Sequence, residues 1–312
     1  MRGRATGPIR WTAVIALVLL GMGLGAGSAQ ACSGKFLLKF GGDWSGAGKL
    51  SSPGEVAIDS KGNVWVLDTG HDRVQKFNSS GEFTLQFGYT GSGNGQFGSP
   101  TGIAIDSEDD VWVASGGARV QEFSSEGSFK QAWSAPGSLI SLTGIAIDSG
   151  GKVWVVGTFF NTPKVKKLST AGEKLLEFGA EGTENSQFKE PQDIAADSEG
   201  NVLVADTGNN RVQEFDSEGA FVRKYGSEGT GNGQFKSPKG ITVDSEGRVW
   251  VADTGNNRIQ RFSSKGTYQT QFGSGGPNDG QFDGPQGVAV DSSGNIWVAD
   301  TGNDRVQKFE CL

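Results

Sequence analysis

Histidine, cysteine and proline are scarce in this sequence. It contains one His, two Cys and nine Pro among 312 residues. A single His does not supply the several imidazole ligands of a His-rich zinc site, and two Cys exclude a dense disulfide framework. At this length one domain buries enough apolar surface to be stable without metal or disulfides. We therefore expect one large domain held together by its own core.

Positive charge is also in short supply. Lys and Arg total 28 against 35 Asp and Glu, which gives a formal net charge of −7. A chain of this sign repels phosphate backbones and anionic membrane surfaces. We therefore expect no nucleic-acid partner.

Glycine, in contrast, is abundant. The chain has 51 Gly, and together with the few prolines this stays below the roughly 25 to 30 % that marks a disordered chain. The composition is that of a turn-rich globular protein.

One apolar run stands out, and it lies at the N-terminus. Arg2, Arg4 and Arg10 precede the run Trp11–Leu20, and a Gly-rich stretch ends in Ala29-Gln30-Ala31. This small-x-small ending is typical of a signal-peptidase site. We predict a secretory signal peptide over residues 1–31 and a mature domain over 32–312.

Two alternatives for this segment remain. An uncleaved anchor is disfavoured because the stretch 11–26 is diluted by glycine and falls short of the about 20 residues of a spanning helix. A lipid anchor on Cys32 is disfavoured because Ala29 and Gln30 stand where a lipobox carries Leu and a small residue. We expect a secreted, extracellular protein without a membrane span.

An internal repeat organises the rest of the chain. A short apolar run ending in Asp recurs every 42 to 49 residues, at Asp59, Asp106, Asp148, Asp197, Asp244 and Asp291. A period near 45 indicates one supersecondary unit per repeat, too thin to bury its own apolar face without stacking on its neighbours.

Each repeat has the pattern of four short β-strands, which we name a to d. The fourth copy contains QDIAAD from Gln192, NVLVADTGNNRVQEF from Asn201 and AFVRKYG from Ala220, separated by the turns DSEG, DTGNN and DSEG. Runs of β-forming residues between Gly- and Asn-containing turns predict antiparallel hairpins. Six such units predict an all-β fold, a six-bladed β-propeller with four antiparallel strands per blade.

Aromatic and charged residues recur at fixed positions of the repeat. Strand b carries Trp65, Trp112, Trp154, Trp250 and Trp297, and strand c carries Phe77, Phe123, Phe215, Phe262 and Phe309. Recurrence in blade after blade favours packing between sheets over an aromatic ligand platform. The Asp and Arg of the DTGNNR turns, such as Asp206 and Arg211, are predicted to form turns and short ion pairs.

The two chain ends are predicted to complete one blade. The last copy ends at Leu312 without a strand d, and CSGKFLLKFG from Cys32 has the form of SSGEFTLQFG from Ser79. The N-terminal strand Lys35–Phe40 should therefore close the last blade as its outer strand. Cys32 and Cys311 then align at the same turn, so we predict a disulfide between them in an oxidising compartment. Two unrelated free thiols are the alternative.

The repeats resemble a known family. PKGITVDSEGRVWVADTGNNRIQRF from Pro238 and PQGVAVDSSGNIWVADTGNDRVQKF from Pro285 are similar to NHL repeats almost letter for letter, and six copies cover residues 35–309. The resemblance implies a propeller used mostly as a recognition platform, in sensor kinases, in tripartite-motif proteins and in a zinc-dependent peptide-amidating lyase. The RING and B-box cysteine patterns, a kinase segment and a set of His ligands are not found in this chain.

The b–c turns and the d–a loops share one face of such a propeller, and we expect ligands to bind there because recognition residues usually lie on loops. Two blades depart from the repeat on this face. Blade 2 has a shortened turn from Ser115 to Arg119, and blade 3 has residues 157–164 in place of the DTGNNR turn. The candidate ligand-binding residues are Ser115, Arg119, Phe159, Phe160, Asn161, Lys164 and His71. The loop Ser134–Leu142 between these blades is also shorter than its counterparts. Phe159 and Phe160 form either an exposed apolar contact or fill the space that this shortened loop leaves.

Two further groups have simple structural explanations. His71 replaces the Asn of the DTGNNR turn, and no nucleophile at a suitable spacing makes it part of a catalytic pair. Lys164, Lys166 and Lys167 form the only basic cluster, and alternation along a strand predicts a solvated edge there.

Composition and repeats together favour a non-catalytic recognition module, a monomer that binds a protein, peptide or glycan. The alternative is a metal-dependent lyase or lactonase-like propeller enzyme. No cofactor is expected, although the recurrent Asp residues leave calcium open. No break in the repeat was found that places an extra carboxylate in the central channel.

Overall fold

The computed structural model describes residues 34–311 except 43, 44, 137, 138 and 161, together with Met1 and Gly3. The chain divides into two units, Met1–Gln30 and Ala31–Leu312, and all described strands lie in the second. The predicted signal peptide, apart from Met1 and Gly3, and Cys32 lie outside the described residues. No helix among the described residues is long and apolar enough to cross a membrane.

Six four-stranded antiparallel sheets form the second unit, and we number them as blades 1 to 6. Blade 1 contains β2 (Pro53–Ile58), β3 (Val64–Asp68), β4 (Arg73–Phe77) and β5 (Phe83–Phe87). Blade 2 contains β6 (Pro100–Ile105), β7 (Val111–Ser115), β8 (Arg119–Phe123) and β9 (Phe129–Ser134). Blade 3 contains β10 (Leu139–Ile147), β11 (Val153–Phe159), β12 (Thr162–Leu168) and β13 (Lys174–Phe178).

The second half of the ring has the same plan. Blade 4 contains β16 (Asp193–Ala196), β17 (Val202–Asp206), β18 (Arg211–Phe215) and β19 (Phe221–Tyr225). Blade 5 contains β20 (Ile241–Val243), β21 (Val249–Asp253), β22 (Arg258–Phe262) and β23 (Tyr268–Phe272). Blade 6 contains β24 (Gly287–Val290), β25 (Ile296–Asp300), β26 (Arg305–Glu310) and β1 (Lys35–Gly41). The short parallel pair β14 (Ala180–Glu181) and β15 (Gln187–Phe188) lies in a d–a loop.

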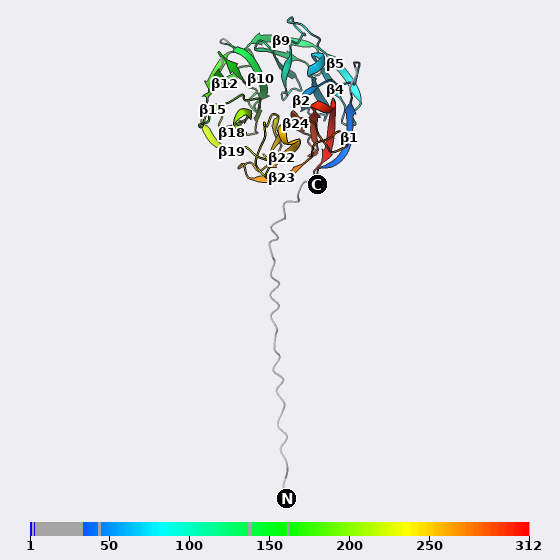
Figure 1. The fold of residues 1–312 in the computed structure, drawn as a ribbon, viewed down its shortest axis with the longest axis vertical. Coiled ribbons are helices and arrows are strands. Elements are labelled where there is room, and N and C mark those ends of the chain that lie inside the picture. The colour runs from blue at the N-terminus through cyan, green and yellow to red at the C-terminus, as the bar shows by residue number, and fades with distance from the viewer. Residues whose placement is uncertain (2, 4–33, 43–44, 137–138, 161, 312) are drawn as a thin grey trace. The chain divides into compact units, whose positions relative to one another are not determined.

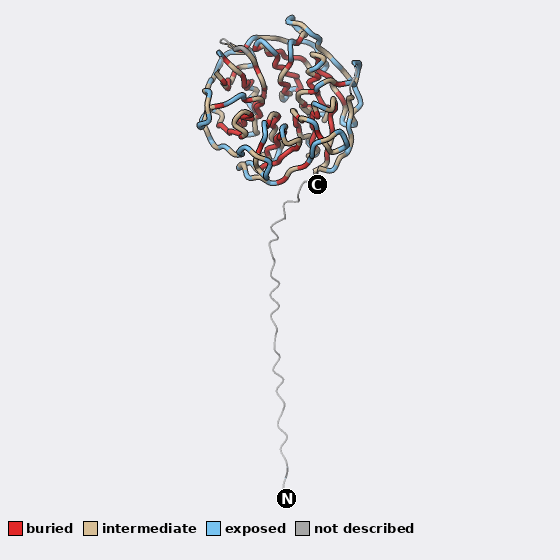
Figure 2. The backbone as a smooth tube through the Cα atoms, in the orientation of Figure 1, coloured by how far each residue is buried: buried red, intermediate tan, exposed pale blue. Residues whose placement is uncertain are grey.

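The blades stand around a central channel, with the first strand of each blade lining it (Figure 1). Burial follows from this position. The middle strand β17 is buried at every residue, because neighbouring blades cover both of its faces. The outer strand β5 is largely exposed, and exposure gathers along the rim of the ring (Figure 2). Strand b is therefore an apolar run up to its final Asp, whereas strand c, the other middle strand, also buries polar side chains.

Six separate apolar clusters hold the ring together, and each is shared by two adjacent blades. The recurrent aromatics lie in these clusters. The five strand-b tryptophans and the strand-c phenylalanines are at most 1 % exposed. The prediction that they form the core is confirmed, and the aromatic ligand platform is not what these residues build.

The DTGNN turns contain a single 3-10 turn followed by a left-handed residue. The turns are η1 (Thr69–His71), η2 (Thr207–Asn209), η3 (Thr254–Asn256) and η4 (Thr301–Asn303). In η2, Asn210 takes φ 52°, a conformation that Asn tolerates better than most residues. Arg211 Nε donates to the buried Asp206 carboxylate at 2.7 Å, and Gln213 Nε2 donates to the same oxygen at 3.0 Å. The predicted ion pairs are present and also hold the d–a loop.

The ring closes as predicted. β1 pairs antiparallel with β26, from Lys35 opposite Glu310 to Gly41 opposite Arg305. This pairing supplies the outer strand of blade 6 and leaves no exposed seam between the chain ends. Cys311 follows β26 and packs against the cluster between blades 5 and 6. The disulfide with Cys32 stays a prediction.

Blade 3 departs from the expected turn. Its hairpin continues as strand to Phe159 and resumes at Thr162, so most of residues 157–164 is strand rather than loop. The expectation of a solvated basic edge is wrong for Lys166, whose side chain is 2 % exposed. Lys166 takes the place of the buried Gln of other blades, where it donates to Pro136 O and pairs with Glu177 at 3.1 Å. Its ammonium also lies over the Phe159 ring.

Candidate functional site

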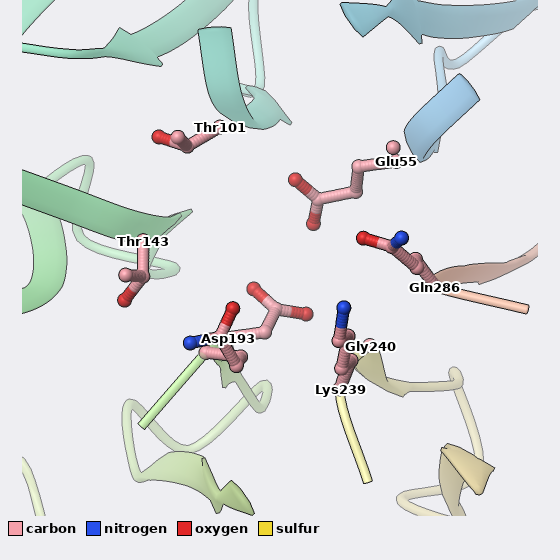
Figure 3. Close-up of a pocket in the computed structure, with 9 residues that line it drawn as sticks. Glu55, Thr101, Thr143, Asp193, Lys239, Gly240 and Gln286 are labelled. Atoms are coloured by element: carbon pink, nitrogen blue, oxygen red, sulfur yellow. The ribbon is translucent and has the colours of Figure 1, made fainter. Parts of the chain in front are cut away.

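The central channel narrows to a polar mouth at one end, which we call the throat. Each blade contributes residues from the start of its first strand, where three of the six copies read Pro-x-Gly. The throat is lined by Gly54, Glu55, Thr101, Thr143, Gln192, Asp193, Lys239, Gly240 and Gln286. It encloses a cavity of about 40 Å³. Figure 3 shows the carboxyl groups of Glu55 and Asp193 pointing into it from different blades.

The throat opens on the face that carries the b–c turns and the d–a loops. Thr207, in the b–c turn of blade 4, donates to Pro238 O at 2.6 Å, one residue before Lys239. Thr301 makes the same contact with Pro53 O at 2.8 Å, just before Gly54. The throat is therefore on the face where binding is expected.

In blades 3 and 5, the close approach of the inner strands leaves no room for a side chain at the third position of the run. A Cβ on Gly240 would lie 2.1 Å from Gln286 O, and a Cβ on Gly144 would lie 2.7 Å from the Asp193 Cα. Four blades keep this glycine, and blades 1 and 4 carry Glu55 and Asp193 instead. In a ring of six, blades 1 and 4 face each other. The two replacements thus place two carboxyl groups on opposite sides of one narrow channel.

Each of these carboxyl groups is held by backbone N–H groups. Ile103 N–H in blade 2 donates to Glu55 Oε2 at 2.8 Å. Ile241 N–H in blade 5 donates to Asp193 Oδ2 at 2.8 Å, and Ile194 N–H donates to its Oδ1 at 2.7 Å. Each acid therefore bridges its own blade to the next, which fixes the orientation of its side chain.

Burial disfavours negative charge in the throat. Asp193 is 6 % exposed, and desolvation raises its pKa to about 7 against the opposing effect of its two backbone donors. Desolvation and the nearby charge of Asp193 raise the pKa of Glu55 well above its ordinary value. Glu55 and Asp193 therefore retain protons at neutral pH, where isolated carboxyl groups have already lost them.

Lys239 brings a positive group to the same cavity. Burial lowers the pKa of its ammonium. No ion pair among the described residues involves the Lys239 side chain. Below the throat the channel is lined by apolar side chains from the inner strands, such as Val56, Ile145 and Val288. Chemically, the throat offers two protonatable acids and an amine above an apolar wall.

Glu55 and Asp193 were not among the residues predicted from the sequence, and the expectation that no extra carboxylate enters the channel is wrong. The signal was present: aligned on the recurrent Asp, the third residue of each run reads Glu, Gly, Gly, Asp, Gly, Gly. Departures in loop length and turn sequence are conspicuous, whereas a single substitution inside strand a is not.

The structure does not gather the sequence-predicted site residues around the throat. Ser115 is buried at the end of β7, and Arg119 Nη2 donates to Asn94 Oδ1 at 2.6 Å. In blade 3, Phe159 is 7 % exposed while Phe160 is 72 % exposed, and Lys164 donates to Gly179 O. Asn161 lies outside the described residues. Of the two phenylalanines, Phe159 fills space and Phe160 faces solvent.

His71 acts within its turn. Its Nδ1 lies 3.0 Å from Asp68 Oδ2, the contact that Asn209 Nδ2 makes with Asp206 Oδ2 at 2.9 Å. His71 therefore substitutes for a structural Asn.

The recurrent Asp residues of the a–b turns do not converge on one cation. In five blades they accept the Trp indole N–H and in all six they accept turn N–H groups. Asp106, Glu108 and Asp110 form the single group of three acids close enough to share an ion among the described residues. There, Asp106 accepts from Trp112 and Asp110 pairs with Lys130.

Comparison with known proteins agrees with the repeat and the fold. The NHL repeat family matches residues 50–77, 188–215, 235–262 and 282–309. A B-box type zinc finger protein, ncl-1 of Caenorhabditis elegans, is 46 % identical over 41 residues, which is 13 % of this chain and 5 % of that protein. The chain thus spans a small part of that relative's length.

Several solved structures share the fold at low identity. A streptogramin B lyase is 19 % identical with a TM-score of 0.57, over 82 % of this chain and 78 % of that one. Virginiamycin B lyase from Staphylococcus aureus is 17 % identical with a TM-score of 0.56, over 83 % and 95 %. A protein of unknown function from Bacteroides thetaiotaomicron is 16 % identical with a TM-score of 0.65, over 91 % and 75 %. Four matching NHL repeats within a ring of six four-stranded blades make this chain a β-propeller that contains NHL repeats.

Proposed function

We propose that this chain is a secreted recognition module without catalytic activity, which binds a protein or peptide by taking up a cationic group in the throat. The observation that carries the proposal is the replacement of the strand-a glycine by Glu55 and Asp193 in opposing blades. The secreted location is supported by the N-terminal sequence pattern alone.

The two carboxyl groups of the throat favour an ammonium or guanidinium group, and the burial that lowers the pKa of Lys239 reduces the competing positive charge in the same cavity. A cation displaces the protons that the buried pair holds, and its attraction to the carboxylates is strengthened where water is scarce. A water-sized group needs at least about 10 to 15 Å³, so the cavity of about 40 Å³ admits the head of a side chain and little more. The body of the ligand would lie across the loops outside.

The reshaped sector of blades 2 and 3 is the surface that we assign to that body. Phe160 is the most exposed large apolar side chain of blade 3, and it lies on the same face as the throat at a b–c turn. A rigid aromatic side chain on a protruding turn is a common recognition element. Of the other candidates, Arg119 and Lys164 belong to the b–c hairpins of these two blades.

The test uses the end-blocked peptide acetyl-Gly-Lys-Gly-amide, whose single ammonium is the lysine side chain, and its acetyl-lysine counterpart as probes, with binding measured by calorimetry at pH 8. We expect binding of the first peptide and loss of binding on acetylation. Glu55→Gly and Asp193→Gly restore the residue of the other four blades, and each should weaken binding. Glu126→Gln, an exposed turn residue, is the matched charge control. Undiminished binding by the Glu55→Gly/Asp193→Gly double variant would overturn the proposal.

A second candidate function is acid–base chemistry of the metal-dependent lyase or lactonase type. It is favoured by the Asp193 carboxyl, whose pKa of about 7 suits proton transfer, and by Lys239 beside it. Glu55 and Asp193 are the residues that would hold a divalent metal, as hard oxygen ligands. Divalent-metal content of the purified protein separates the candidates: a stoichiometric metal that is lost in Asp193→Gly favours the enzyme.

A further inference from the structure

Blade 4 lacks the tryptophan that the other five blades carry in strand b. Leu203 stands at this position in β17, in place of Trp65 in β3 and Trp250 in β21. The aligned residues around it are otherwise those of the repeat. A large buried ring is therefore replaced by a smaller aliphatic side chain at one point of the molecule.

The structure shows what the tryptophan does elsewhere. Its indole N–H donates to the Asp of the a–b turn, for example from Trp65 Nε1 to Asp59 Oδ2 at 3.1 Å and from Trp250 Nε1 to Asp244 Oδ2 at 2.8 Å. In four blades a Lys or Arg of strand c lies over the ring, at 4.5 to 5.3 Å from its centroid. Each such ring thus has a polar partner at its edge and a cation at its face.

A cavity of about 380 Å³ opens between blades 4 and 5 where this ring is missing. We call it the blade-4 pocket. Its apolar wall is formed by Leu203, Val243 and Val249, and its acidic wall by Asp197, Glu199 and Glu214. In the next blade interface, Trp250 shares its cluster with Val290 and Ile296, the repeat counterparts of Val243 and Val249. The pocket therefore has the walls of a tryptophan site without the tryptophan.

The hydrogen-bonding partner of the missing ring is still in place. Asp59 Oδ2 accepts from both Asn63 Nδ2 and Trp65 Nε1, whereas Asp197 Oδ2 accepts from Asn201 Nδ2 at 2.8 Å. Within the described part of the chain, no second side chain donates to Asp197 Oδ2. An indole N–H entering the pocket would find the acceptor that the repeat provides.

The charge at the ring face is reversed. Opposite Leu203, Glu214 takes the place of the Lys or Arg that four blades carry in strand c, and it is 5 % exposed. Blade 2 also has an acid here, Glu122, opposite Trp112. Burial raises the pKa of Glu214, with Arg223 acting against that rise, and Arg223 Nε lies 3.2 Å from its carboxylate. Four acids line the pocket, counting Glu246, against Arg223 and Lys265. The excess of acids favours a positively charged occupant.

We propose that the blade-4 pocket is a binding site for an aromatic cation, a planar ring with an N–H donor that carries an ammonium group. The ring takes the position of the missing tryptophan and donates to Asp197, and the ammonium faces Glu214. The pocket volume lies in the range of small-molecule sites. It opens at the a–b and c–d turns, on the face opposite the throat, so it is independent of the function proposed for the throat.

The experiment measures binding of tryptamine to the mature protein by calorimetry, with indole and butylamine as half-ligands. We expect tryptamine to bind with a Kd of about 1 mM or tighter and each half-ligand to bind at least about tenfold more weakly. The dipeptide Lys-Trp tests whether the same group is accepted from a protein. A preference for tryptamine assigns a free arylethylamine, and a preference for Lys-Trp assigns a peptide. If neither compound binds, the proposal is overturned.

Leu203→Trp restores the repeat residue and supplies the key variant. It should fill the pocket, abolish tryptamine binding and leave melting unchanged or higher. Glu214→Gln should weaken tryptamine about tenfold with little effect on indole, which holds even if Leu203→Trp fails to fold. Asp193→Gly, in the throat, should not alter tryptamine binding. Unchanged tryptamine affinity in both Leu203→Trp and Glu214→Gln would show that the amine binds elsewhere.

Discussion

At the scale of single residues, comparison of the blades separates the acids that recur in the turns from the two acids that replace a glycine of the repeat. The turn acids Asp68, Asp206, Asp253 and Asp300 are fully buried, and each accepts from an Arg and a Gln of its own blade. Asp193 and Glu55 belong to a different class, because they replace glycine and meet in a channel. Substitution should therefore have opposite consequences in the two classes.

A turn acid should be costly to remove. In Asp253→Ala, the guanidinium of Arg258 loses the carboxylate that Nε contacts at 2.6 Å, and the Lys236 N–H loses its acceptor at 2.7 Å. Breaking a buried pair by removing one partner costs about 3 to 5 kcal/mol. We expect a loss of this size in urea unfolding at pH 7. Asp216→Ala is the comparison, because this half-buried turn acid accepts from the N–H groups of Glu218 and Ala220 and has no Arg partner. It should cost less, and equal losses in the two variants would contradict the network argument.

A throat acid should instead give pH-dependent destabilisation. The pKa of Asp193 is raised to about 7 in the folded chain from an ordinary value near 4, so the folded state holds a proton that the unfolded chain releases between these values. Stability should therefore be full below about pH 4 and fall as pH rises to 7, by up to roughly 4 kcal/mol.

Asp193→Asn removes this titration. The variant should be less stable than the parent, or equal to it, at pH 4, and should gain relative to the parent as pH rises to 8. Urea unfolding at pH 4, 5, 6, 7 and 8 measures the difference, with Glu126→Gln as the control that should show no trend. A difference that is constant across the series would rule out a raised pKa at Asp193.

At the scale of elements, a blade keeps its strand order when its turn and single residues of its strands change. Blade 3 exchanges the DTGNN turn for a longer hairpin in which Gly157 pairs with Lys164 and Phe159 with Thr162. Lys166 replaces the buried Gln of strand c, and its ammonium forms an ion pair with Glu177. The strand order of the blade is nevertheless unchanged.

We expect the tip of this hairpin to contribute to ligand binding and not to the stability of the blade. Phe160 is exposed and takes φ 42°, a left-handed conformation that is unfavourable for a bulky residue. Phe160→Gly should therefore leave the melting temperature unchanged or raise it, while weakening binding of a protein ligand by removing the aromatic contact. Phe129→Gly, in an outer strand of blade 2, should lower melting because it weakens a strand. A melting temperature that falls in Phe160→Gly would mean that the ring supports the hairpin.

At the scale of the whole molecule, periodicity predicted most of the fold. The blade number, the buried Trp and Phe positions and the closure by residues 35–40 followed from the repeat, because packing between blades imposes the same requirement six times. What could not be read in this way was specific to one position. Lys166 was predicted to be solvated because alternation along a single strand takes no account of the neighbouring blades, which cover both faces of a middle strand. Leu203 leaves a pocket because the next blade supplies the opposite wall, and this wall cannot be read from the sequence of blade 4 alone.

The ring closure gives the last prediction. β1 and β26 are far apart in sequence and pair along their whole length, so the outermost strand of blade 6 is held by hydrogen bonds and by Phe36 and Leu38 packing into the adjoining clusters. A covalent link between Cys32 and Cys311 would tie this strand to the end of the chain that it completes. In the chain-entropy model, closing so long a loop adds about 4 to 5 kcal/mol.

Intact mass of the exported protein should show two hydrogens fewer than the reduced chain, and reductant should lower the melting temperature. Cys311→Ser should melt like the reduced parent and should not respond to reductant, which separates the disulfide from other effects of the reagent. Gly34→Ala, next to the predicted link, is a control for damage to the strand itself, since a Cβ there would lie 2.3 Å from Phe272; it should destabilise with or without reductant. Two free thiols in the exported protein, or melting that does not respond to reduction, would mean that strand pairing alone holds the ring closed.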